Sequence, residues 1–129
     1  YTTLFRSTLE FYRAPGSITP LASKIECQLD TGRTHQIRVH MAHNKTPLIG
    51  DATYGNSTQT HLNRFKSAGV RLPESTLIAL GNFNRQALHA RQLILLHPEN
   101  NEQMQFVAPI PEDLVTLENA LAALTKSDS

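Results

Sequence analysis

The chain has 129 residues, of which 40% are hydrophobic and 18% charged, and its formal net charge is +1. This length suits one folded domain and is too short for two ordinary ones; no apolar run approaches the ~20 residues of a membrane span, and the polar amino end is not typical of a secretory leader, so we expect neither a membrane nor a secreted protein. The single cysteine, Cys27, cannot form an internal disulfide, which favours a reducing cytoplasm.

Two amphipathic strands are expected at the amino end. Residues 3–12 and 21–30 both alternate with a period of two, which places one face of each strand toward a core. Pro15 and Gly16 in the link are a turn signal, so we predict an antiparallel hairpin. The expected inner faces are Phe5, Leu9 and Phe11 in the first strand, and Leu21, Ser23, Ile25, Cys27 and Leu29 in the second.

A helix is predicted next, followed by an ordered loop. Thr31 and Gly32 interrupt the strand, and Thr34 can cap a helix that runs to about Asn44, before Pro47. Its expected core-facing residues are Ile37, Val39 and Met41. The loop covers 48–56 and contains Gly50, Asp51, Tyr54 and Gly55.

The second half is predicted to contain a further hairpin and a terminal helix. We expect a short helix over 58–68, an irregular segment over 69–84, a strand over 85–97, a turn at 98–101 and a partner strand over 103–107. Residues 111–124 are typical of an amphipathic helix, with Leu114, Leu117, Leu121 and Leu124 at helical spacing. The expected fold class is mixed α/β (α+β), with mainly antiparallel strands and helices packed on one side.

Positive charge is concentrated in the middle of the chain. Between Arg33 and Arg91 there are eight Lys or Arg residues and only two acids, Asp51 and Glu74, which leaves +6, whereas the segment after Pro109 is acidic. Such a distribution suits a polyanion bound on one face, although ordinary surface charges can produce it too.

Residues 29–40 contain the highest density of side chains able to bind a ligand or take part in catalysis. Gly32 allows a close approach of the backbone to a ligand, and the helix start that follows is a natural anion site. Arg33 precedes this helix, where a guanidinium can bind phosphate with two hydrogen bonds. Three further polar residues, His35, Gln36 and Arg38, occupy its first turn and a half. The later segment 85–91 adds two arginines and a histidine.

A metal site is the obvious competing interpretation of these histidines. The candidate ligands are His35, His40, His43 and His89. Their spacing does not match the zinc motif with two histidines four residues apart and a glutamate between them. No acid lies within 33–43, and the arginines would repel a divalent cation. We therefore expect no metal.

The segment Thr31–His40, which reads TGRTHQIRVH, resembles the third conserved motif of the RluA-type RNA pseudouridine synthases. Three later segments resemble that family in the correct order. They are Pro47–Asp51 with Tyr54 and Gly55, Leu88–Ala90 with Leu93, His97 and Pro98, and Phe106–Pro109.

The resemblance implies a pseudouridine synthase-like catalytic core and a reaction. Such enzymes isomerise uridine in RNA to pseudouridine without metal or organic cofactor, so ribosomal or transfer RNA is the expected partner. Arg38 matches the arginine that pairs with the catalytic aspartate, and Leu88 matches an apolar residue beside the target base. Residues placed to hold RNA are Arg33, His35, Gln36, His40, Arg85, His89 and Arg91.

One part of the family pattern is absent. The catalytic aspartate belongs to a His-Arg-Leu-Asp-type segment that has no counterpart here, and neither Asp30 nor Asp51 occupies its position. We therefore expect residues 1–129 to be the carboxy-terminal part of a single catalytic domain, inactive alone and either marginally stable or self-associating. Two alternatives remain at this point: a non-catalytic RNA-binding module that keeps the motif as a phosphate grip, and a structural domain with incidental cations. The oligomeric state stays open.

Overall fold

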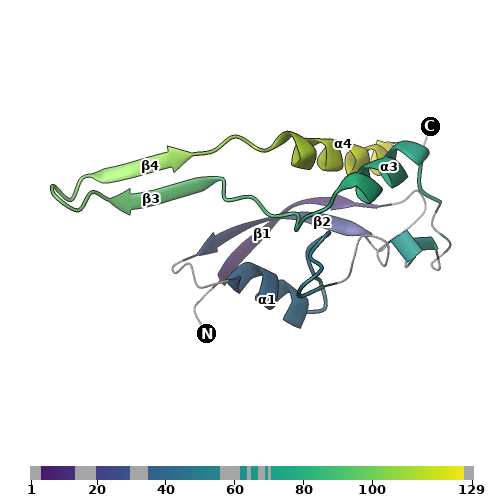
Figure 1. Ribbon diagram of the computed structural model, residues 1–129, viewed down its shortest axis with the longest axis horizontal. Coiled ribbons are helices and arrows are strands. Elements are labelled where there is room, and N and C mark those ends of the chain that lie inside the picture. Colours follow the sequence, from purple (N-terminus) through teal and green to yellow (C-terminus); the bar gives the residue numbers. More distant parts are fainter. Residues whose placement is uncertain are drawn as a thin grey trace.

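The computed structural model describes residues 4–13, 20–29, 35–55, 62–63, 65–66, 69 and 71–126. Its elements are β1 (Leu4–Tyr12), β2 (Ala22–Leu29), α1 (Gln36–His43), α3 (Glu74–Asn82), β3 (Gln92–Leu96), β4 (Gln103–Val107) and α4 (Glu112–Lys126). Figure 1 shows α1 on one side of the β1–β2 hairpin and the two later helices on the other, with β3 and β4 extending as an arm. The described part therefore has mixed α/β architecture, as predicted, but its helices lie on both sides of the first hairpin (Figure 1), so the prediction that they pack on one side is wrong.

The first two strands pair antiparallel, as predicted, from Leu4 opposite Leu29 to Tyr12 opposite Ala22. The register shifts between Thr8 and Glu10, so β1 contains a bulge. The expected inner face of β1 is wrong beyond this point, because the extra residue reverses the alternation. Leu9 and Phe11 are exposed, and Tyr12 is buried instead.

β2 follows its predicted alternation only in part. Ile25, Cys27 and Leu29 are half-buried as expected, but Ser23 is exposed and Lys24 is half-buried. Lys24 lies opposite the bulge of β1 and reaches Glu118 of α4, with 3.1 Å between its Nζ and a carboxylate oxygen. The change of face thus occurs where the two strands shift register.

α1 begins at Gln36, after His35 with a left-handed φ of 55°. The proposed cap Thr34 lies outside the described residues. Met41 is buried and Ile37 is half-buried, as predicted. Val39 is 41% exposed, so its prediction as a core residue is wrong. Two residues span about 200° of helix, which turns Val39 away from the face that Ile37 and Met41 share.

The core lies between the carboxy-terminal helices and the end of β1. It consists of Tyr12, Phe65, Leu80, Phe83, Leu117, Leu121 and Leu124. α4 confirms the predicted amphipathic helix, since three of the four predicted leucines are buried and Leu114 packs against the core. Leu62, Asn63, Phe65 and Lys66 are helical, in agreement with the helix predicted over 58–68.

α3 corrects the prediction that residues 69–84 are irregular. The helix begins after Pro73, with Glu74 in its first turn, and buries Thr76 and Leu80. Thr76 donates a hydrogen bond from Oγ1 to the carbonyl oxygen of Ala120 in α4, at 3.0 Å. Packing against α4 thus stabilises α3, which is too short to be recognised from its sequence pattern alone.

The predicted strand over 85–97 is confirmed only from Gln92 to Leu96, where β3 pairs antiparallel with β4. Residues 85–91 instead form an irregular segment. The backbone of this segment forms hydrogen bonds with other parts of the chain. Ala87 donates its N–H to the carbonyl of Ile49 at 2.8 Å, and the carbonyl of Arg91 accepts from the N–H of Ala108 at 2.8 Å. The described strands form two separate two-stranded sheets rather than one. No helix in the described ranges is long and apolar enough to cross a membrane.

Candidate functional site

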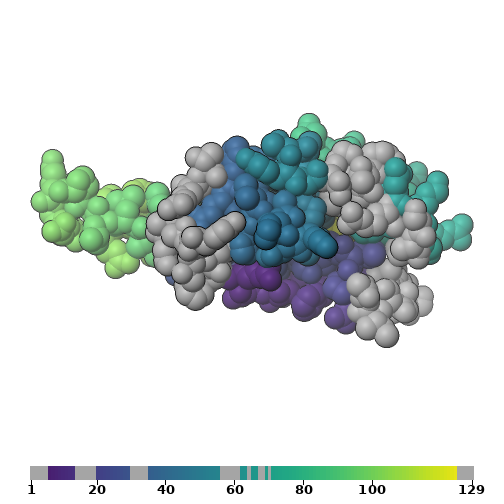
Figure 2. Space-filling view, turned by 90° about the horizontal axis from the view of Figure 1, so that it is seen from below, coloured from purple at the N-terminus to yellow at the C-terminus, as the bar shows by residue number. Residues whose placement is uncertain are grey.

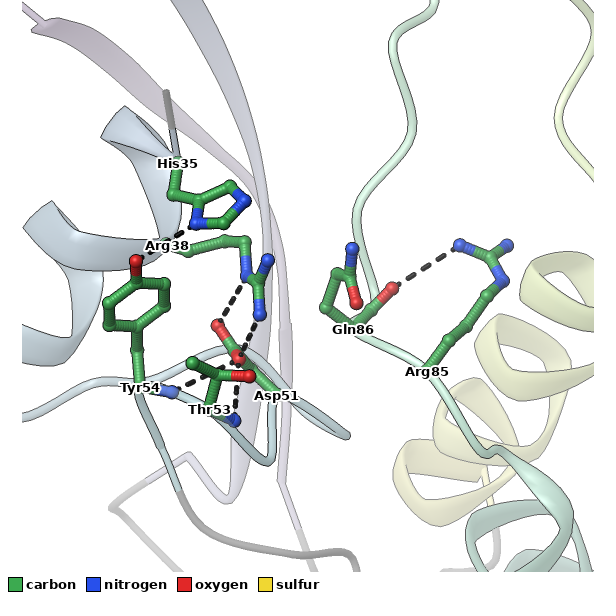
Figure 3. Close-up of polar contacts among 7 residues, drawn as sticks. All are labelled: His35, Arg38, Asp51, Thr53, Tyr54, Arg85 and Gln86. Atoms are coloured by element: carbon green, nitrogen blue, oxygen red, sulfur yellow. Dashed lines mark hydrogen bonds and ion pairs between the residues drawn. The ribbon is translucent and has the colours of Figure 1, made fainter. Parts of the chain in front are cut away.

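The loop after α1 folds back against the helix and brings Asp51 to Arg38. α1 ends at His43, and Lys45, two residues later, has a left-handed φ of 63° and donates its N–H to the carbonyl of Ala42. Gly50, with φ +80°, turns the chain a second time, and Gly55 N donates to the Asp51 carbonyl at 2.9 Å. These two turns place residues thirteen apart in sequence side by side (Figure 3).

Arg38 and Asp51 form a bidentate ion pair. Arg38 donates from Nε to Oδ2 at 3.0 Å and from Nη2 to Oδ1 at 2.8 Å. The side chain of Asp51 has no exposed surface, and that of Arg38 is 12% exposed. A carboxylate this deeply buried needs further donors, and the backbone N–H groups of Thr53 and Tyr54 supply them at 3.2 Å each.

The electrostatics of the pair keep both partners charged. The hydrogen bonds from Arg38 hold the pKa of Asp51 below its usual value, against the opposing effect of burial, and the backbone donor of Tyr54 acts in the same direction. The same hydrogen bonds raise the pKa of Arg38. Asp51 therefore acts as a fixed negative charge, since protonation of this carboxylate is disfavoured.

Aromatic rings complete what we call the Arg38 cluster: Arg38, Asp51, Tyr54 and His35. The guanidinium carbon of Arg38 lies 5.0 Å from the centre of the Tyr54 ring. A 2.9 Å hydrogen bond joins His35 Nδ1 to Tyr54 Oη, and the two rings meet edge to face. Figure 3 shows His35 and Tyr54 on the same side of the guanidinium. Arg38 is thus held along one edge and over one face.

The segment that carries Leu88 lies directly against this loop. The Ala87–Ile49 hydrogen bond is one contact between them. Gly50 provides another, because it lies so close to the backbone of Arg85 that a Cβ added to Gly50 would be 2.0 Å from the carbonyl oxygen of Arg85. Leu88, next to Ala87, is half-buried. The two residues predicted to be catalytic therefore stand on segments that touch.

Arg85 points away from Arg38, toward α4 (Figure 3). It forms a bidentate pair with Asp113, at 2.8 and 2.9 Å, and donates from Nη1 to the carbonyls of Gln86 and Leu88. This pairing raises the pKa of Arg85 and lowers that of Asp113. Arg85 fastens the segment before Leu88 to α4.

The remaining predicted RNA-binding residues occupy several settings. His89 donates from Nε2 to the carbonyl of Ala108 at 3.1 Å, and His40 Nε2 accepts from Asn44 at 3.2 Å. Arg91 is 64% exposed and approaches Glu26 at 3.4 Å. Gln36 is half-buried, and its Oε1 has no hydrogen-bond partner among the described residues. Arg33 lies outside the described residues.

Sequence reasoning missed Asp51 and Tyr54 as partners of Arg38. One signal was present, because Asp51 is one of only two acids in the cationic stretch from Arg33 to Arg91. Among the described residues no three His, Cys, Asp or Glu side chains come together in a way that could hold a metal ion. Burial raises the pKa of the Cys27 thiol.

Comparison with known proteins gives several relatives with one name. The chain is 48% identical over 101 residues to "ribosomal large subunit pseudouridine synthase D" of Xanthomonas campestris, a match that covers 75% of this chain and 27% of that protein. The namesakes from Haemophilus influenzae and Xylella fastidiosa are also 48% identical, over 78% and 81% of this chain and 29% and 28% of theirs. The chain thus spans less than a third of the length of these curated relatives. No family model matches it.

Proposed function

Because the chain belongs to the pseudouridine synthase family, we propose that it is the carboxy-terminal part of the catalytic domain of an enzyme that converts uridine in ribosomal RNA to pseudouridine. The observation that carries this proposal is the identity of 48% across three quarters of the chain or more. The names of the relatives favour ribosomal over transfer RNA, and they favour an enzyme over a module that only binds RNA.

The proposed reaction is an isomerisation. The N1–C1′ glycosidic bond of the uridine breaks, a C5–C1′ bond forms, and the proton at C5 leaves to solvent while N1 gains one. Uracil must first leave the base stack, at a cost of a few kcal/mol that contacts in the pocket offset. We assign Leu88 to the wall of that pocket. No metal and no organic cofactor is needed for this exchange of bonds.

Arg38 is proposed to orient the catalytic aspartate, which lies in a part of the enzyme outside this chain. An adjacent guanidinium favours the ionised carboxylate and fixes its direction. Three features support this role: the permanent charge of Arg38, its restraint by Asp51 and Tyr54, and the contact of its loop with the segment before Leu88.

RNA is proposed to lie over the face that carries α1 and the loop after it. Figure 2 views that side, where α1 and the following residues, in blue to teal, form much of the described surface. The proposed contacts with RNA are Arg33, His35, Gln36, His40 and Arg91. The side chain of Arg91 is more exposed than those of Arg38 and Arg85. Arg85 and His89 would act mainly by holding the backbone around Leu88. We place the enzyme in the cytoplasm, in keeping with a ribosomal RNA substrate and a single cysteine.

Tritium release from RNA labelled at C5 of uridine tests the function, because the C5 proton is lost in the reaction. The complete protein that contains this chain should release tritium from a ribosomal RNA transcript, and Arg38→Ala should abolish the release. The 129-residue chain alone should release none. A complete protein without activity on ribosomal RNA would overturn the proposal, and activity of the chain alone would overturn the assignment of the catalytic aspartate to another segment.

RNA binding by the chain alone separates the proposal from a structural domain with incidental cations. Affinity for ribosomal RNA should fall steeply as salt rises from about 50 to about 200 mM, because phosphate contacts release counterions. Binding that is absent or insensitive to salt would favour the structural domain.

A further inference from the structure

We propose that Asp51, backed by Tyr54, is a positioning residue for the reaction: it holds one edge of the Arg38 guanidinium so that the opposite edge is presented to a second carboxylate. This inference rests on the proposed function, which supplies that carboxylate as the catalytic aspartate. Asp51 itself would touch neither the base nor the sugar.

The geometry of the guanidinium carries the argument. A guanidinium has five N–H donors in one plane, which form two edges able to bind a carboxylate with two hydrogen bonds. Asp51 occupies the edge formed by Nε and Nη2. No residue in the described part of the chain accepts a hydrogen bond from Nη1, so none of them occupies the edge formed by Nη1 and the second hydrogen of Nη2. A second carboxylate can bind there without displacing the first.

Asp51 is suited to act as a fixed support. Its carboxylate is held by two backbone donors as well as by Arg38, and its carbonyl oxygen accepts from Gly55. It has no exposed surface and therefore no room to change rotamer. The Tyr54 ring limits movement of the guanidinium out of its plane. Arg38 can thus keep its direction before the second carboxylate arrives, which is the condition for an aimed catalytic group.

Asp51 also sets the charge that the catalytic carboxylate meets. Arg38 and Asp51 together are neutral, whereas Arg38 alone would present a full positive charge. The pair therefore stabilises the ionised catalytic aspartate less than a lone arginine would. Removing the charge of Asp51 should lower the pKa of the catalytic aspartate further, even while the geometry deteriorates.

The test is the pH dependence of steady-state tritium release by the complete protein, as wild type and as Asp51→Asn. The variant keeps the size of the side chain but turns an amide toward Arg38. We expect kcat to fall by up to about 100-fold, the loss that a misplacement of about 1 Å can cause, while KM for RNA changes by less than about twofold. The acid limb of the rate profile should move to lower pH. Glu118→Gln is the matched control, because it removes one acid and the ion pair with Lys24 on α4; its acid limb should stay in place.

A double-mutant cycle shows whether Asp51 acts through Arg38. If it does, Arg38→Lys combined with Asp51→Asn should lose no more activity than Arg38→Lys alone. Tyr54→Leu serves if Asp51→Asn fails to fold, because Tyr54 is exposed: kcat should fall with KM retained, and the acid limb should not move, since no charge changes. An unchanged kcat in that variant would overturn the inference.

Besides an unchanged kcat of Tyr54→Leu, three results would overturn the inference while leaving the proposed function intact. The first is an unchanged or higher rate for Asp51→Asn, which would mean that Asp51 competes with the catalytic aspartate for Arg38. The second is additive losses in the cycle, and the third is a folded Asp51→Asn variant that loses RNA affinity and kcat in parallel with no shift of the acid limb. An inactive wild-type protein would instead reject the proposed function.

Discussion

Gly50 is the residue at which the loop of the Arg38 cluster meets the backbone that carries Leu88. Two properties forbid a side chain there, the left-handed φ of +80° and the contact with the carbonyl of Arg85. The second obstacle is backbone rather than a flexible side chain, so it cannot simply move aside. Gly50 is therefore a constraint on both segments of the proposed site.

Gly50→Ala should destabilise the chain by about 2 kcal/mol or more, since the left-handed conformation alone costs an L-residue roughly 1–2 kcal/mol. Chemical denaturation measures this loss. Gly81→Ala is the matched control: nothing lies within 4 Å of a Cβ at this position of α3. It should be neutral or stabilising by up to about 1 kcal/mol. Equal stability of the two variants would contradict the described contact.

Tyr12 predicts a loss of stability in alkali. Burial, reinforced by the charges of Glu10 and Glu118, raises its pKa from 10.0 to about 12. A group with a raised pKa in the folded state stabilises the fold fully below its unfolded pKa and loses that contribution as pH rises through the folded value. The free energy of unfolding should thus fall between about pH 10 and pH 12, and Tyr12→Phe should flatten this fall. Curves of the same slope for both proteins would refute the prediction.

At this scale the sequence identified Arg38 but not its partner. The motif around Arg38 is continuous, so its position could be predicted from the order of residues alone. Asp51 reaches Arg38 only because Lys45 and Gly50 turn the loop back, and such turns depend on backbone angles that residue spacing does not encode. The bulge of β1 is a similar case, since one extra residue reversed the predicted inner face.

The helices and strands differ in how strongly their sequences specify them. α4 has a long amphipathic pattern and was predicted almost to its ends, whereas α3 has only nine residues and two exposed apolar side chains, Leu77 and Ile78. Its existence depends on burial of Leu80 and on the bond from Thr76 to α4. Residues 85–91 of the strand predicted over 85–97 are irregular for the converse reason. A backbone hydrogen bond from Ala87 to Ile49 and the ion pair of Arg85 with Asp113 of α4 take the place of strand pairing.

Leu80→Ala should therefore cost about 2–5 kcal/mol of stability, the usual range for a fully buried leucine. Leu80 is 1% exposed, whereas Leu77 on the same helix is 42% exposed. Leu77→Ala should change the free energy of unfolding by less than about 0.5 kcal/mol. Thermal or chemical unfolding of both variants measures the difference, and a small effect at Leu80 would show that α3 does not rest on this side chain.

For the whole molecule, the β3–β4 hairpin is the most unusual feature. It extends away from the body (Figures 1 and 2) and exposes apolar side chains on both strands. The exposed apolar residues of the hairpin are Leu93, Ile94, Leu95, Leu96, Phe106 and Val107. An isolated two-stranded hairpin is marginally stable in water, and exposed apolar strands tend to associate.

We expect the 129-residue chain to associate with a second copy through this hairpin. Leu93 and Phe106 are direct cross-strand partners, so Leu93→Lys with Phe106→Glu should keep the hairpin and remove the association. Sedimentation at rising concentration measures it. Ile78→Lys, which changes an exposed apolar residue on α3, should leave the association unchanged. A wild-type chain that stays monomeric at every concentration would contradict the expectation.

The Arg38 cluster is drawn from one short stretch, residues 35–55, so its assembly needs no side chain from any other polypeptide. In the proposed enzyme one half of the reaction centre is consequently finished before the other half docks. Two separately expressed pieces, one with this stretch and one with the catalytic aspartate, then form a split enzyme, in which RNA modification reports that the pieces have met.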